Sequence, residues 1–254
     1  MIEVIEVSVI MPFFKKIFFF KEAYYSILNQ GIKNLEIIVI YDDEDISDLS
    51  SIKKIIDNKK NTHLIINKKN FGAGVSRNTG IKIAKGKYIA FLDCDDIWNK
   101  NKLKYQINFM KKNNLDITYT SYTVINETGK KLYNVVARNE LNYQDLLKSC
   151  EIGLTSVVMK RSIFDNFKFS KIKTKEDYLL WLTLSKSNYK LTGIKKILSF
   201  WRINKNSLSS NALQKIRDSF RIYYHFEKQN FLKTIVSIII LSFFAFKKNR
   251  FLKL

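Results

Sequence analysis

The chain has 254 residues, the length of one large domain or of a domain with an appendage. Hydrophobic residues make up 46% of it, aromatic residues 14% and charged residues 26%, which excludes a disordered chain, a coiled coil and a collagen-like rod. Cys94 and Cys150 are too few cysteines for a disulfide scaffold or a zinc cluster. The net charge of +21 requires an anionic partner or surface, and the composition predicts an intracellular globular protein.

The first hundred residues predict alternating strands and helices. Short apolar runs at residues 7–11, 36–41 and 88–92 have the length and β-branched or aromatic content of buried strands. Helical patterns lie between them at residues 18–29, 48–58 and 73–84. This order predicts an α/β fold, a mostly parallel sheet flanked by helices, whose ligands bind at the carboxyl ends of the strands.

The second half is less regular. It predicts helices at residues 100–112, 143–150 and 175–186 and strands at 116–125 and 156–160, followed by a basic loop at 201–210. The composition shifts near Phe200, and residues 195–254 hold more than half of the excess positive charge. A genome biased toward Lys, Asn and Ile offers the alternative explanation that part of this charge has no function.

The C-terminal segment contains an apolar run at residues 235–246 with basic residues on both sides, among them Lys233, Lys247 and Lys248. A membrane-spanning helix needs about 20 apolar residues, so this run is too short to cross a bilayer. It predicts a helix that lies in an anionic membrane interface. The alternatives are a helix buried within the protein and a dimer contact.

Paired carboxylates end the third predicted strand. Asp93 and Asp95 are two residues apart, so their side chains project to the same side. Crowded carboxylate oxygens without His or thiolate neighbours select Mg²⁺ or Mn²⁺, which usually bridges substrate phosphates. The alternative is a strand-to-helix turn in which Asp96 or Asn99 caps the following helix.

Glycines cluster between positions 72 and 86, and four of the eight in the chain lie there. Glycine at the start of a helix allows close backbone approach and exposes N–H groups to a phosphate or nucleotide. Arg77 adds a forked donor one turn into this helix. An ordinary loop with helix caps is the alternative.

Four motifs stand in order along this half: VSVIMP at 7–12, EIIVIYDD at 36–43, NFGAGVSRNTG at 70–80 and AKGKYIAFLDCDD at 84–96. Together they resemble the nucleotide-sugar half of a family-2 inverting glycosyltransferase with a GT-A fold. Glu44 and Asp45 depart from the Gly-Ser or Asn-Ser that usually follows in the family. The resemblance implies donor contacts from Pro12, Phe13, Asp43, Asn70, Gly72, Arg77 and Asp93, and a metal site at Asp95 and Asp93 for Mn²⁺ or Mg²⁺.

The resemblance continues in the acceptor half. Glu176 and Asp177, with Trp181 one turn later, are similar to the family motif whose aspartate takes the proton from the acceptor hydroxyl. The spacing of Thr174 and Asp177 also matches a helix capping box, which would make Asp177 structural. Trp201 and Arg202 resemble a basic segment that closes over the donor, which implies a diphosphate contact for Arg202 and either an acceptor platform or a core position for Trp201.

The resemblance thus implies a GT-A domain at residues 1–200, divided into a nucleotide-sugar half at 1–98 and an acceptor half at 99–200. A basic lid loop and a helical extension follow at residues 201–254. The implied function is transfer of a hexose from a UDP-sugar to a hydroxyl of a growing surface glycan, at the inner face of the plasma membrane. The partners would be this donor, a glycan or lipid-linked acceptor and an anionic membrane surface, but no nucleic acid.

Two other functions compete with this one. A nucleotidyltransferase that makes nucleotide-sugars would carry a glycine- and arginine-rich loop after the first strand, where residues 12–16 here are PFFKK. A nucleic-acid binder would explain the +21 charge but would leave the acidic turn at residues 93–96 without a purpose.

Overall fold

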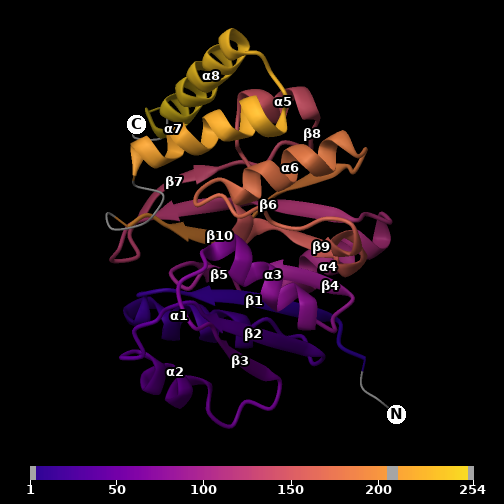
Figure 1. Cartoon of the computed structure of the whole chain (residues 1–254). Helices are drawn as coiled ribbons and strands as arrows, with labels where there is room; N and C mark the ends of the chain where they lie inside the picture. Colours follow the sequence, from indigo (N-terminus) through magenta and orange to yellow (C-terminus); the bar gives the residue numbers. More distant parts are fainter. Residues whose placement is uncertain (1–3, 205–210, 251–254) are drawn as a thin grey trace.

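The computed structural model of the protein describes residues 4–204 and 211–250 and shows a ten-stranded mixed sheet flanked by helices (Figure 1). The strands are β1 Val7–Phe13, β2 Leu35–Tyr41, β3 Thr62–Ile66, β4 Tyr88–Phe91, β5 Ile97–Trp98, β6 Ile117–Ile125, β7 Lys131–Val135, β8 Glu140–Leu141, β9 Val158–Lys160 and β10 Leu191–Arg202. Their order is β3-β2-β1-β4-β9-β6-β10-β5, with β7 paired to β6 and β8 to β10. This arrangement confirms the predicted α/β fold.

The strand directions bring six carboxyl ends to one edge of the sheet. Strands β1 to β4 are parallel to one another, β9 runs antiparallel between β4 and β6, and β10 is parallel to β6. The arrowheads of β1 and β6 accordingly point to the same side in Figure 1. Loops that follow β1, β2, β3, β4, β6 and β10 therefore meet at this edge.

The sheet is buried on both faces, as the continuous apolar runs predict. In β1, Val7, Val9 and Met11 pack into one core and Ile10 into the other, and β2 alternates in the same way. The period of two assigns successive side chains to opposite faces. Side chains of these strands that pack into either core are therefore unable to reach a ligand.

Helices cover both faces. They are α1 Ile17–Leu28, α2 Leu49–Ile56, α3 Ala73–Ile83, α4 Lys102–Lys112, α5 Tyr143–Lys148, α6 Glu176–Lys186, α7 Ala212–Phe220 and α8 Phe231–Arg250, with a π-helical turn η4 at Arg221–Phe226 and 3₁₀ turns η1 at Leu154–Ser156 and η2 at Arg161–Asp165. Side chains of α1, α2 and α4 fill one core, and those of α5 and α6 fill the other. Strands β3 and β10 lie outside the predicted elements, and β10 takes in Trp201 and Arg202, which the sequence placed in a loop.

The C-terminal elements are attached to α6 along its whole length. At its start, the Asp218 carboxylate of α7 accepts hydrogen bonds from the backbone N–H and the hydroxyl of Thr174, both at 2.9 Å. One turn into α6, the hydroxyls of Tyr178 and Tyr223 share a hydrogen bond of 2.9 Å. At its end, Lys186 forms an ion pair with Glu227. The extension therefore holds α6 in place, and Figure 1 shows α7 and α8 beyond α6, away from β1 to β3.

Helix α8 is only partly covered by the protein. Thr234 and Leu241 are buried, whereas Leu232, Val236, Ile239 and Phe243 are exposed and recur at helical spacing along the helix. The apolar run therefore does not pack internally on all sides. No helix in the described part of the chain is long and apolar enough to cross a membrane.

Replacement of Asp218 by Ala should destabilise the protein and loosen the start of α6. The change leaves the buried N–H and hydroxyl of Thr174 without an acceptor, which costs about 3 kcal/mol of unfolding free energy. Chemical denaturation measures this loss. Hydrogen exchange should also become faster in a peptide that spans residues 170–180.

Asp145→Ala is the matched control, because Asp145 belongs to the capping box of helix α5. It should cost about 1 kcal/mol and leave exchange at residues 170–180 unchanged. Unchanged exchange at residues 170–180 in Asp218→Ala would show that this carboxylate does not hold α6.

Candidate active site

The candidate site lies at the edge of the sheet where the parallel strands end. Loops that follow β1, β2, β3 and β4 supply residues of the donor motifs, and the first turn of α6 supplies Glu176 and Asp177. Hydrogen bonds and ion pairs connect these segments, although up to 99 residues separate the partners. The fold thus brings the two groups of motifs together.

Asp42 organises the loop that enters α3. Its buried carboxylate accepts hydrogen bonds from the side-chain amide of Asn67 at 2.7 Å and from the backbone N–H groups of Phe71 and Gly72, both at 2.9 Å. Gly72 has a φ of 89°, a left-handed conformation that favours glycine. Sequence reasoning missed this role, whose only signal was the acidic pair that ends β2.

Four predicted donor residues lie in or beside this loop. Asp43 is buried and accepts a hydrogen bond from the backbone N–H of Asp45 at 3.1 Å. Asn70 is exposed, and the space next to Gly72 is open. Pro12 at the end of β1 is half-buried. These positions leave a surface at the ends of β1 and β2 that is accessible to a ligand.

Phe13 is unable to line that surface. Its ring is fully buried and stacks on Tyr41, with the ring centroids 5.2 Å apart. It belongs to the same face of β1 as Met11, which packs into the core below α1. The prediction that Phe13 contacts the base is therefore wrong, because the strand period turns its side chain inward.

Arg77 bridges the two halves of the site. It is buried, and its Nη2 donates to Asp93 Oδ1 at 2.7 Å while its Nη1 donates to Glu176 Oε1 at 2.5 Å. Burial lowers the pKa of Arg77, but the two carboxylates outweigh this effect and raise it above the usual value. Both terminal nitrogens are used within the protein, so this geometry assigns Arg77 to holding the carboxylates in place rather than to a nucleotide base.

Asp95 lies beside this bridge and attracts a cation. Its Oδ2 is 3.0 Å from the ammonium of Lys16. Burial raises the pKa of Asp95, Lys16 opposes this shift, and Asp93 raises the pKa further. The two carboxylates fit a hard divalent ion, which would offset their repulsion. Within the described residues no three His, Cys, Asp or Glu side chains cluster, so such an ion would complete its coordination with oxygens of substrate and water.

Arg202 supports the acidic turn at residues 93–96 through hydrogen bonds. Its backbone N–H donates to Asp96 Oδ1 at 2.8 Å, and its Nε donates to the carbonyl oxygen of Asp95 at 2.8 Å. Its Nη1 and Nη2 donate to the carbonyl oxygen of Glu127 and to the carboxylate of Glu22. A diphosphate contact was predicted for Arg202, but the protein itself occupies every nitrogen of this guanidinium, which instead positions Asp95. Asp96 caps no helix, because it pairs with the end of β10.

Asp177 does not form the capping box that its spacing from Thr174 suggests. The hydroxyl and backbone N–H of Thr174 bond to Asp218, so the capping box between Thr174 and Asp177 is absent. Asp177 Oδ1 accepts a hydrogen bond from the backbone N–H of Tyr178 at 2.7 Å. Burial and the charge of Glu176 raise the pKa of Asp177 to about 6, although Arg77 opposes the shift. Asp177 is therefore a carboxylate whose basicity is above normal at the edge of the site.

The two tryptophans predicted on the acceptor side differ in exposure. Trp181 is fully buried in the core, so the prediction of an acceptor contact is wrong for this residue. The residues next to Trp181 in α6 are buried as well, and the short motif did not reveal this packing. Trp201 is half-buried and packs edge-on against Tyr122 at a centroid distance of 6.4 Å.

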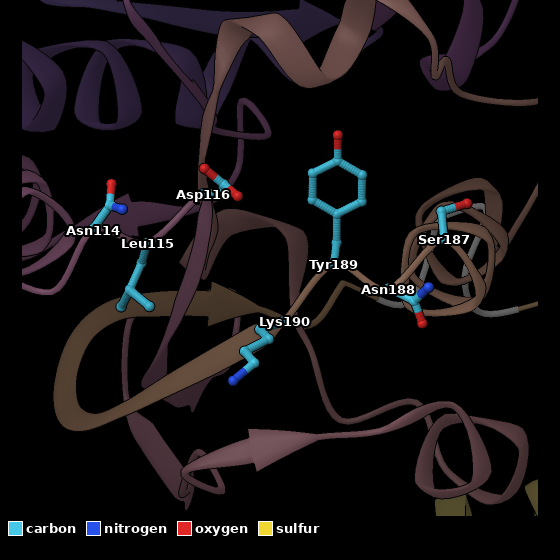
Figure 2. Close-up of a pocket in the computed structure, with 7 residues that line it drawn as sticks. All are labelled: Asn114, Leu115, Asp116, Ser187, Asn188, Tyr189 and Lys190. Atoms are coloured by element: carbon cyan, nitrogen blue, oxygen red, sulfur yellow. The ribbon is translucent and has the colours of Figure 1, made fainter.

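A separate shallow pocket of about 300 Å³ lies away from this site. Figure 2 shows its lining residues, which come from the turns at 114–116 and 187–190. These turns precede β6 and β10, so the pocket lies at the amino ends of those strands, at the opposite edge of the sheet. It contains none of the candidate residues.

Comparisons with known proteins agree with this geometry. The sequence model described as Glycosyl transferase family 2 matches residues 8–172. The chain is 35% identical over 246 residues to the Escherichia coli protein named UDP-Glc:alpha-D-GlcNAc-diphosphoundecaprenol beta-1,3-glucosyltransferase WfgD, an alignment that covers 96% of this chain and 95% of WfgD.

Two solved structures share the fold. S. aureus TarS 1-349, in complex with UDP-GlcNAc, superposes with a TM-score of 0.71 at 19% identity, over 85% of this chain and 64% of that one. The mannosyltransferase PcManGT from Pyrobaculum calidifontis, in complex with GDP-Man and Mn²⁺, gives a TM-score of 0.68 at 12% identity, over 89% and 65% of the two chains. The family match and the shared architecture decide against a nucleotidyltransferase: the chain belongs to glycosyltransferase family 2 and has the GT-A fold.

Proposed function

We propose that this glycosyltransferase moves a hexose from a UDP-sugar to a hydroxyl of a lipid-linked saccharide, with inversion at the anomeric carbon. The observation that carries the proposal is Asp177, a basic carboxylate that forms no capping box with Thr174 and lies beside the Arg77 bridge and the Asp93–Asp95 pair. The names of two similar proteins support the substrates. WfgD is named for UDP-Glc and a diphosphoundecaprenol acceptor, and TarS was solved with UDP-GlcNAc.

Asp177 is the base in the proposed reaction. It takes the proton of the acceptor hydroxyl as that oxygen attacks the anomeric carbon, and the bond from this carbon to the diphosphate breaks on the opposite face. A pKa of about 6 suits this role, because the carboxylate is ionised at neutral pH and is more basic than an ordinary aspartate. Glu176, held by Arg77, fixes the first turn of α6 and with it the position of Asp177.

Asp93 and Asp95 are the residues that would hold Mn²⁺ or Mg²⁺. When bound, the ion supplies positive charge that stabilises the departing diphosphate. Arg202 keeps the backbone of Asp95 in place, and Lys16 adds a further positive charge next to that carboxylate. The nucleoside lies at the ends of β1, β2 and β3 in this proposal, against Pro12, Asp43, Asn70 and Gly72.

The exposed apolar stripe of α8 is proposed to dock on the inner face of the plasma membrane. Leu232, Val236, Ile239 and Phe243 would enter the interface, and basic residues of the extension would attract anionic lipids. A lipid-linked acceptor is confined to such a surface. This docking would place the enzyme next to its substrate.

Titration of UDP into the protein should show saturable binding that requires Mn²⁺ and is lost in EDTA. Asp95→Ala should weaken this binding at least tenfold, because the ion loses a ligand. Isothermal calorimetry measures both effects. Asp116→Ala, at the opposite edge of the sheet, is the control and should bind UDP as the unmodified protein does. Metal-independent binding of equal strength would contradict the assigned metal site.

Asp177→Asn should lower the rate of transfer by about 10²–10⁴-fold and change UDP affinity by less than about threefold, because it removes only the base. In the unmodified enzyme, kcat/KM should fall about tenfold per pH unit below about pH 6, where Asp177 becomes protonated. The exposed Asp165→Asn variant should keep the normal rate. Transfer by Asp177→Asn at the normal rate would exclude Asp177 as the base.

The same substitution has an effect on stability. Because the pKa of Asp177 is raised on folding, its contribution to stability is fully present below about pH 4 and is lost as pH rises through about 6. Asp177→Asn should therefore unfold at a higher denaturant concentration than the parent at pH 8 but not at pH 3.5.

The protein should co-sediment with vesicles that contain anionic phosphatidylglycerol, and this binding should weaken as the salt concentration rises. Replacement of Ile239 and Phe243 by Glu should reduce binding at least tenfold. Ile46→Glu is the control, since Ile46 is 67% exposed in the loop after β2. A dimer in solution that the α8 substitutions convert to a monomer would instead identify the stripe as a dimer contact.

A further inference from the structure

A groove of about 770 Å³ opens beside the acidic turn, on a part of the surface to which no role has been given. Phe18, Phe19 and Glu22 of α1 form one wall. Thr128 and Gly129, in the turn between β6 and β7, form the other, and Arg202 at the end of β10 forms the floor. The volume is within the range of ligand-binding pockets.

The groove exists because the far end of the sheet returns to α1. Strands β10 and β5 pair at Ser199 and Trp98, and the backbone N–H of Trp98 donates to Ser26 of α1 at 3.2 Å. This contact brings the ends of β6 and β10 close to the first turns of α1. Residues from three distant parts of the chain thereby enclose one space.

The groove adjoins the proposed donor site at Asp95. Arg202 donates to the carbonyl oxygen of Asp95, and Lys16, two residues before Phe18, contacts the carboxylate of Asp95. Along the sheet edge, the proposed nucleoside residues follow β1, β2 and β3, and the aspartates follow β4. The turn and floor of the groove follow β6 and β10, and its other wall is α1. A donor laid along this edge would direct its sugar toward the groove.

The lining has the chemistry of a site for a neutral sugar ring. Phe18 is 86% exposed, an unusual position for a large apolar ring, and it offers a flat surface to the C–H face of a pyranose. The side chain of Glu22 is 58% exposed, with Oε2 bound by Arg202, so Oε1 is available to accept a hydroxyl hydrogen. The same carboxylate repels phosphate and is unfavourable next to a hydrocarbon chain.

We infer that this groove is the acceptor subsite, which binds a neutral sugar ring of the acceptor stacked on Phe18 with a hydroxyl donated to Glu22. The inference rests on the proposed function, because it assigns a substrate to the same reaction. It names a specificity-determining surface that the sequence motifs do not include. Phe18 contacts the acceptor and takes no part in donor binding.

The test is the binding of neutral methyl glycosides to the full chain in the presence of UDP and Mn²⁺. Saturation-transfer NMR would screen glucosides, galactosides, N-acetylglucosaminides and rhamnosides and measure a Kd for those that bind. Phe18→Ala should raise this Kd at least tenfold, and Phe18→Trp should keep it within about threefold. Tyr25→Ala is the matched control, since Tyr25 is 42% exposed on the same helix but does not line the groove.

Three outcomes would contradict the assignment of the groove to a sugar ring of the acceptor, and a fourth would contradict the proposed function itself. Failure of every glycoside to bind the unmodified protein, or equal binding by Phe18→Ala, would overturn the inference. Displacement of the glycoside by a short alkyl phosphate at equal concentration would assign the groove to the lipid part of the acceptor and would also overturn it. Absence of UDP binding in the calorimetric titration would refute the proposed function, independently of the result with Phe18.

Discussion

The buried bridge of Arg77 to Asp93 and Glu176 is the interaction on which the site depends. It joins residues that are 16 and 99 positions away in the chain, one after β4 and one in the first turn of α6. A buried guanidinium is stable only when carboxylates and hydrogen bonds replace its water, so the two loops are unable to separate without exposing an unpaired charge. This constraint fixes the distance between the proposed donor side and the proposed base.

The same bridge makes the site acidic in a basic protein. Asp93 and Glu176 bind the buried arginine, and their negative charge contributes to the raised pKa values of the neighbouring Asp95 and Asp177. For Asp95 the excess negative charge favours a bound cation. For Asp177 it favours basicity. The same excess of negative charge thus favours both the cation at Asp95 and the basic carboxylate of Asp177 in the proposed reaction.

The sequence predicted those features that local patterns determine. The buried strands β1, β2 and β4, the helices between them and the paired aspartates follow from periodicity and spacing. Strand β3 was missed because it is short and half-exposed, and β10 because Gly193, Lys195 and Lys196 interrupt its pattern. The tasks of Arg77 and Arg202 depend on partners distant in the chain, which no local motif reveals.

A residue outside the motif, Asp218, prevents the capping box between Thr174 and Asp177. Thr174 and Asp177 have capping-box spacing, but Asp218 of α7 takes the hydrogen bonds of Thr174 and leaves the Asp177 carboxylate available. The extension that carries the exposed stripe of α8 therefore also holds the turn that precedes the proposed base. Because Tyr223 and Glu227 continue the same attachment along α6, a force on the extension at a membrane would act directly on the helix that bears Asp177. The proposed membrane docking and the proposed base would in this way be mechanically linked through one helix.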